Sequence, residues 1–142
     1  MPARSELAEM LRRVPLFEGL SRKELEAVLL SADEVDHASG KEVVSEGAEG
    51  AAGFHLILAG EAEVLQRGSR LKQITAGDFF GDIALLDGGP RSATVRALTP
   101  LRTLSITSWN FRPLLHEHPD LAYKLLIELC RRLRAAEALA TA

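Results

Sequence analysis

Cysteine, excess positive charge and long apolar runs are all scarce in this chain of 142 residues. The single cysteine, Cys130, excludes an intrachain disulfide. No apolar run approaches the length of a membrane span, and the polar N-terminus lacks the apolar core of a secretory signal. We therefore expect a cytoplasmic protein without a membrane partner, in which Cys130 is a buried structural thiol of a helix.

The charge balance argues against a surface built for nucleic acid. Lys and Arg number 17 against 20 for Asp and Glu, which gives a net charge of −3, whereas nucleic-acid binding needs a concentrated basic patch. We interpret the cluster of Arg131, Arg132 and Arg134 as a solvated helix face. With 46% hydrophobic residues, we expect a single domain over residues 1–142, long enough to bury a core.

The pattern divides the chain into a helical segment at 1–33, a β-rich segment at 34–107 and a helical segment at 108–142. Ser21 and Glu24 have the spacing of a capping box at the start of the second helix. Trp109 and Phe111 are expected to pack their helix onto the strands. Glycines separate short strands that we predict at 34–37, 41–44, 54–58, 62–66, 71–75, 92–97 and 101–106. Such strands indicate an all-β sandwich, jelly roll or barrel, with 54–58 at its centre.

One loop, residues 80–95, combines the groups that a sugar phosphate needs. Gly81 opens a helical turn whose backbone N–H groups can face an anion. Arg91 can bind the same anion with two hydrogen bonds, and the Asp82 carboxylate can accept one from a hydroxyl. The alternative for Arg91 is a surface salt bridge with Asp82 or Asp87.

This loop, together with Glu46-Gly47, the strand 54–58, Gly60 and Val64, strongly resembles the cyclic nucleotide-binding domain family. The resemblance covers nearly the whole chain. It implies a mainly β fold with flanking helices: an eight-stranded jelly-roll β-barrel, or double-stranded β-helix, with N-terminal helices and a long C-terminal helix. It also implies a regulatory module and not an enzyme, with a cyclic nucleotide as ligand and no metal or other cofactor.

By this resemblance, Arg91 pairs with the cyclic phosphate, and the N–H groups of Ile83 and Ala84 add donors. Gly81 lets the backbone approach the ribose, Asp82 accepts the ribose 2′-hydroxyl, and Ser92 reaches the phosphate or the purine. In the C-terminal helix, Arg132 and Ala136 lie where relatives cap the base. We expect cAMP to be preferred over cGMP.

Two positions depart from the family pattern. Asp82 stands where the family usually has glutamate, and its carboxylate is one methylene shorter. Loss of that hydrogen bond would cost about 1–3 kcal/mol, or about ten- to hundredfold in affinity. Ala136 stands where transcriptional relatives carry a hydroxyl that meets adenine, so selection of the base by that hydroxyl is absent.

Other features suggest no chemistry. His116-Glu117-His118 has the spacing that metal-binding cupins use, but it lies at a helix end before Pro119, and His37 and His55 look isolated, so we expect no metal site. No serine or cysteine has a convincing base partner, which argues against an enzyme.

The C-terminal helix carries a second functional indication. A heptad-like seam indicates a homodimer or, alternatively, packing on the chain's own β-domain; its residues are Leu126, Leu129, Leu133, Ala136 and Ala140. The chain ends at Ala142, where transcriptional relatives continue into a DNA-binding domain, so direct DNA binding is not expected. We expect a cyclic nucleotide sensor that signals to a protein partner through movement of this helix, either free-standing or as a piece of a longer protein. The alternative is a jelly-roll interaction or dimerisation module with a degenerate pocket.

Overall fold

A computed structural model describes residues 3–48 and 53–141. The outer bounds predicted for the domain, residues 1 and 142, lie outside the described residues. Contacts divide the chain into two compact units, Ser31–Arg112 on one side and Met1–Leu30 with Pro113–Ala142 on the other. We call them the β unit and the helical unit. No helix among the described residues is long and apolar enough to cross a membrane.

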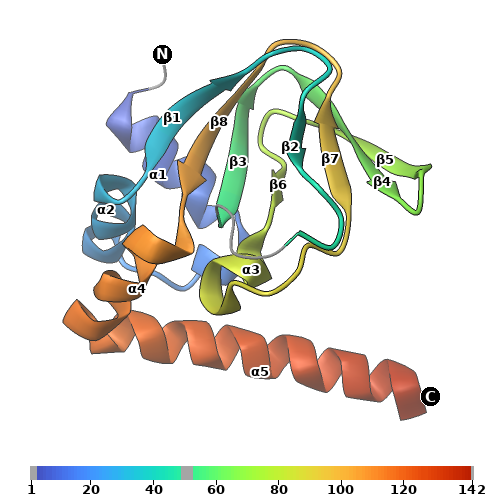
Figure 1. The fold of residues 1–142 in the computed structure, drawn as a ribbon. Coiled ribbons are helices and arrows are strands. Elements are labelled where there is room, and N and C mark those ends of the chain that lie inside the picture. The colour runs from blue at the N-terminus through green and yellow to red at the C-terminus, as the bar shows by residue number, and fades with distance from the viewer. Residues whose placement is uncertain (1–2, 49–52, 142) are drawn as a thin grey trace. The chain divides into compact units, whose positions relative to one another are not determined.

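The β unit contains eight strands in two antiparallel sheets of four, drawn as two layers in Figure 1. One sheet has the order β1-β8-β3-β6 and the other the order β2-β7-β4-β5. The strands are β1 (Asp33–His37), β2 (Glu42–Val44), β3 (Phe54–Ala59), β4 (Glu61–Gln66), β5 (Ser69–Thr75), β6 (Phe79–Phe80), β7 (Thr94–Ala97) and β8 (Leu101–Ile106). The eight strands implied by the resemblance are present, and seven of them were placed from the sequence, but they form two facing sheets and not a closed barrel.

Alternating apolar residues of both sheets build the core of the β unit. Ile57 and Leu101 come from the first sheet, and Val44, Ala62, Val64, Ile74, Val95 and Ala97 from the second. Strand β3 is inner in its sheet, between β8 and β6, as its continuous apolar run predicted. A short helix, α3 (Asp82–Asp87), contacts β3 (Figure 1).

The helical unit contains α1 (Arg4–Arg12), the 3-10 turn η1 (Pro15–Phe17), α2 (Arg22–Leu30) and α5 (Pro119–Thr141). Helix α4 (Ser108–Glu117) begins in the β unit and ends in the helical unit. The predicted capping box of α2 is present: the Ser21 N–H donates to Glu24 Oε1 at 2.8 Å, and the Glu24 N–H donates to Ser21 Oγ at 3.2 Å. Lys124 of α5 donates to the same Glu24 oxygen at 2.7 Å.

Two expectations about burial were wrong. Phe111 is buried, but Trp109 is 86% exposed, because residues two apart on a helix point about 200° from each other and only one can face the strands. Cys130 is exposed. It lies five residues beyond the buried Leu125, about 140° around the helix from it.

Candidate functional site

A cavity of about 480 Å³ opens in the β unit beside the predicted loop. It brings together every residue that we expected in the β unit to bind a ligand: Gly81, Asp82, Ile83, Ala84, Arg91 and Ser92. Phe79, Phe80 and Asp87 also line it. A volume of this size suits one small organic molecule.

A row of three valines, followed by a lysine, crosses one wall of this cavity. Val44 of β2 and Val64 of β4 both pair with Val95 of β7, and Val64 pairs in turn with Lys72 of β5. All four line the cavity. Neighbouring strands lie about 4.8 Å apart, so the valines offer a flat apolar surface that suits a ring system.

Gly81 allows the backbone to cross close under Arg91. Its φ of 83° lies in the left-handed region, and it forms the N-cap of α3. A Cβ at this position would collide with the carbonyl oxygen of Gly53 and with Nη1 of Arg91. Gly81 therefore allows the turn into α3 and also leaves room for the Arg91 guanidinium to approach the backbone.

Arg91 is the most unusual charged group of the site. It is 7% exposed, and neither Nη1 nor Nη2 has a hydrogen-bond partner among the described residues. Burial lowers the pKa of its guanidinium. The alternative of a surface salt bridge with Asp82 or Asp87 does not fit, because the Arg91 side chain is buried and Nη1 and Nη2 have no hydrogen-bond partner among the described residues. A buried cation without a partner is costly, and an anion in the cavity would remove that cost.

Asp82 is partly buried, and its Oδ1 accepts a hydrogen bond from the Ile83 N–H at 3.0 Å. One donor that we assigned to a ligand is thus engaged by the neighbouring carboxylate. A ligand that bound both the Asp82 carboxylate and the Ile83 N–H as expected would have to break this hydrogen bond. Ser92 lies exposed at the rim, directly after Arg91.

Behind this site runs a buried chain of hydrogen bonds that the sequence did not indicate. His55 Nδ1 pairs with Ser105 Oγ at 2.8 Å, Ser105 Oγ with Thr103 Oγ1 at 2.8 Å, and Thr103 Oγ1 with His37 Nε2 at 3.0 Å. The two imidazole rings lie 6.1 Å apart. The histidines are not isolated as expected, because β1 and β3 both pair with β8 and so bring residues 18 apart in sequence together.

His55 connects this chain to the cavity. Its ring stacks on Phe80, with centroids 4.9 Å apart. Burial, the charge of Arg91 and the neighbouring His37 together lower the pKa of His55 to about 3. Its Nε2 has no hydrogen-bond partner among the described residues. The imidazole is therefore neutral at physiological pH and adds no second positive charge near Arg91.

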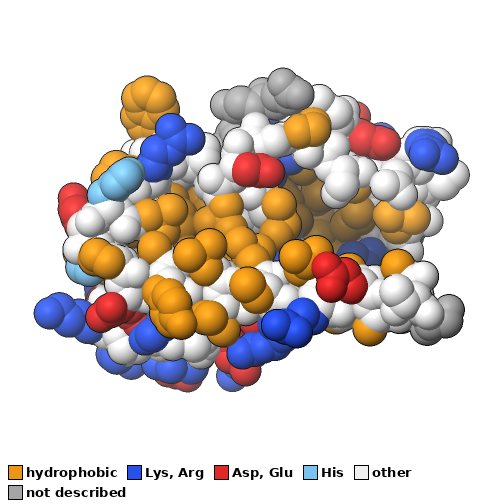
Figure 2. Space-filling view, turned by 90° about the horizontal axis from the view of Figure 1, so that it is seen from below, with side chains coloured by type: hydrophobic (Ala, Val, Ile, Leu, Met, Phe, Trp, Pro, Cys, Tyr) orange, Lys and Arg blue, Asp and Glu red, His pale blue; other side chains and the backbone are white. Residues whose placement is uncertain are grey.

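The remaining predicted positions lie in the helical unit. Arg132 and Ala136 are on α5, and the base contact expected of them stays a prediction. Apolar side chains gather along α5 in Figure 2. Tyr123, Leu126 and Leu133 of α5 are each more than half exposed. The described residues contain no group of three or more His, Cys, Asp or Glu side chains that could hold a metal ion.

Comparison with known proteins gives a consistent picture. Residues 34–118 match the profile described as "Cyclic nucleotide-binding domain". The cAMP-dependent protein kinase regulatory subunit of Eremothecium gossypii is 39% identical over 109 residues, which cover 75% of this chain and 23% of that protein. A CRP-like cAMP-activated global transcriptional regulator of Mycobacterium tuberculosis is 28% identical over 131 residues, 89% of this chain and 58% of that one.

The chain thus spans about a quarter of the kinase regulatory subunits that it matches. Among solved structures, the N-terminal domain of a transcriptional regulator from Streptomyces coelicolor A3(2) superposes with a TM-score of 0.84 at 29% identity, covering 92% of this chain and 94% of that one. Thermus thermophilus Catabolite Activator Protein gives a TM-score of 0.69 at 29% identity, covering 89% and 62%.

Proposed function

Since the chain belongs to the cyclic nucleotide-binding domain family, we propose that the cavity beside Arg91 binds a cyclic nucleotide and that cAMP is preferred over cGMP. The observation that carries the proposal is the buried guanidinium of Arg91, whose terminal nitrogens have no hydrogen-bond partner among the described residues. The names of relatives such as the kinase regulatory subunits support cAMP as the ligand.

Each group at the cavity has a role in this proposal. Arg91 binds the cyclic phosphate with two charge-assisted hydrogen bonds. Gly81 lets the ribose approach the backbone, and Asp82 accepts the 2′-hydroxyl. The Ile83 and Ala84 N–H groups add donors, and the exposed Ser92 reaches the phosphate or the purine. The valine row supplies an apolar surface for the base.

The regulatory half of the proposal concerns α5. We infer that the nucleotide shifts the position of this helix by binding one position more tightly than another, with Arg132 and Ala136 near the base. The exposed Leu126 and Leu133 support a homodimer through the same helix. In this proposal the protein is a cytoplasmic regulator without catalytic activity that acts on a protein partner.

Titration calorimetry of the purified chain with cAMP and cGMP tests the proposal. Arg91→Ala is expected to weaken binding about hundredfold or more, because it removes two hydrogen bonds to a charged group. Arg96→Ala is the matched control: Arg96 is a half-exposed arginine of β7 that pairs with Glu63 and does not line the cavity. Equal affinities of the two variants, or no heat with either nucleotide at millimolar concentration, would contradict the proposal.

One observation favours a second candidate, an interaction module whose pocket no longer binds nucleotides. The short carboxylate of Asp82 already holds the Ile83 N–H. The same titration separates the two functions, and Asp82→Glu sharpens it. If the pocket is functional, the longer side chain should tighten binding by about tenfold; if the pocket is degenerate, neither the parent nor this variant gives heat.

A further inference from the structure

Arg91 precedes β7 and lies in no helix or strand, yet its side chain is buried, and its Nη1 and Nη2 find no hydrogen-bond partner within residues 3–48 and 53–141. An unpaired cation gains hydration when it turns outward, so the fold must fix the backbone from which it projects. Two hydrogen bonds do this directly: the Arg91 N–H donates to the Ala48 carbonyl at 3.0 Å, and the Gly47 N–H donates to the Arg91 carbonyl at 2.8 Å. The segment 46–48 is therefore the support of Arg91.

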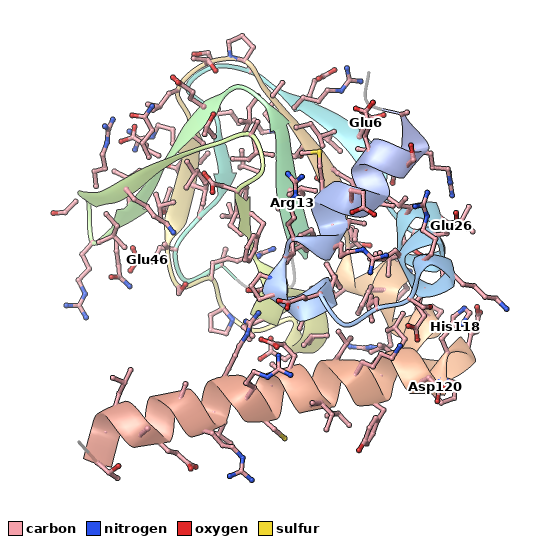
Figure 3. All side chains as sticks on the ribbon, turned by 180° about the vertical axis from the view of Figure 1, so that it is seen from behind. Glu6, Arg13, Glu26, Glu46, His118 and Asp120 are labelled. Atoms are coloured by element: carbon pink, nitrogen blue, oxygen red, sulfur yellow. The ribbon has the colours of Figure 1, made fainter. Side chains whose placement is uncertain are left out.

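That support is itself tied to the hairpin formed by β4 and β5. Glu46 Oε1 accepts the N–H of Arg67 at 2.9 Å, and the Glu46 N–H donates to Thr94 Oγ1 at 2.9 Å. Arg67 and Gly68 form the turn of the hairpin, both with positive φ, 53° and 80°. Figure 3 shows Glu46 beside this hairpin. The Glu46 carboxylate thus joins the hairpin turn to the segment 46–48, which in turn holds the backbone of Arg91.

A side chain of the hairpin itself holds Ser92, the residue after Arg91. Gln66, the last residue of β4, donates from Nε2 to the carbonyl of Ser92 at 3.1 Å. Glu46, through the segment 46–48 and Thr94, and Gln66, through Ser92, therefore restrain the backbone at Arg91 and directly after it. Neither side chain lines the cavity.

We propose that Glu46 and Gln66 are positioning residues for Arg91, and that the β4–β5 hairpin holds the anion site in its binding geometry before the ligand arrives. Preorganisation of this kind increases affinity without any new contact to the ligand. The inference rests on the proposed function for its effect on binding, but the restraint itself is measurable without a ligand.

The ligand-free test is amide hydrogen exchange measured by NMR. Glu46→Ala should speed exchange of the Gly47 and Arg91 amides about three- to tenfold, the effect of losing one modest hydrogen bond, and leave the β8 amides unchanged. Glu46→Gln keeps an oxygen acceptor and should restore slow exchange. Glu61→Ala, which removes an exposed glutamate of β4, is the matched control. Exchange at Gly47 and Arg91 that is the same in Glu46→Ala and the parent would overturn the inference.

The binding test uses cAMP and cGMP. Glu46→Ala and Gln66→Ala should each weaken binding about three- to tenfold, whereas Glu46→Gln and Gln73→Ala, a change of an exposed glutamine on β5, should not. Faster exchange with unchanged affinity would overturn the positioning role. If the parent binds neither nucleotide but Glu46→Ala still speeds exchange, the proposed function fails and the restraint of Arg91 stands.

Discussion

His55 is a buried imidazole whose lowered pKa makes the stability of the fold depend on pH. Its pKa is lowered to about 3 in the folded chain by burial, by Arg91 and by His37, against an ordinary value near 6.5 in the unfolded chain. Below pH 6.5 the unfolded chain takes up a proton at this residue and the folded chain does not. The stability contributed by the neutral ring is therefore present above pH 6.5 and is lost as the pH falls.

We expect the free energy of unfolding to fall between pH 6.5 and pH 5 by up to about 1.4 kcal/mol per pH unit for this one group. His37, whose pKa burial also lowers, acts in the same direction. His55→Phe keeps the aromatic stack on Phe80 and should reduce the slope. Urea denaturation at several pH values measures it, and an unchanged slope in the variant would contradict the assignment to His55.

Arg91 and Asp82 could be predicted as site residues because they lie close together in one motif with a glycine. The burial of Arg91 could not, since it depends on contacts with residues 47 and 48, far away in the sequence. The chain of hydrogen bonds that links His37 to His55 could not be predicted either, because the two residues meet only through the register of β1 and β3 on β8. Local motifs indicate which residues line the cavity; long-range pairing decides how those residues are held.

The first turn of helix α2 holds a carboxylate with two partners. Glu24 accepts hydrogen bonds from the Ser21 N–H and from Lys124, and its own N–H donates to Ser21 Oγ. Burial raises the pKa of Glu24, but the hydrogen bonds from Lys124 and Ser21 outweigh burial and hold the pKa below its ordinary value of 4.5. A carboxyl of this kind stabilises the fold above its ordinary pKa, and that contribution is lost as the pH falls through the lowered value.

Glu24→Gln is therefore expected to lower the free energy of unfolding at pH 7 by about 1–2 kcal/mol, since it replaces charge-assisted hydrogen bonds with weaker ones. It should also remove the part of the acid destabilisation that appears below pH 4.5. Glu26→Gln, on an exposed position of the same helix, is the control. Parallel curves of stability against pH for Glu24→Gln and the parent would refute this role.

Most strands were predictable because glycine turns and apolar alternation bound them. The predicted strand 101–106 is confirmed with both ends in place, and 54–58 is one residue short. Strand β6 was missed, since two residues, Phe79 and Phe80, are too few to show any period. The position of Gly81 directly after it explains this brevity, because the chain must leave the sheet there to begin α3.

Self-association is the prediction that concerns the complete chain. If α5 forms the dimer, analytical ultracentrifugation at tens of micromolar should give twice the mass of one chain. The double variant Leu126→Glu and Leu133→Glu places charges on the apolar seam and should give a single chain, because charged residues are costly in a desolvated interface. Arg134→Glu, at an exposed position, should still dimerise. A parent that sediments as a monomer would contradict the proposed dimer.

The two terminal nitrogens of Arg91, for which the described part of the chain offers no hydrogen-bond partner, also make the composition of the buffer matter. A guanidinium that lines a cavity can donate to the oxygens of any small oxyanion. Phosphate or sulfate in the buffer should therefore compete for the site, and the apparent dissociation constant of a cyclic nucleotide should rise in proportion to the competitor once the competitor exceeds its own dissociation constant. An affinity measured in phosphate buffer would then describe an exchange of one anion for another and understate how well the site binds a nucleotide when no other anion competes.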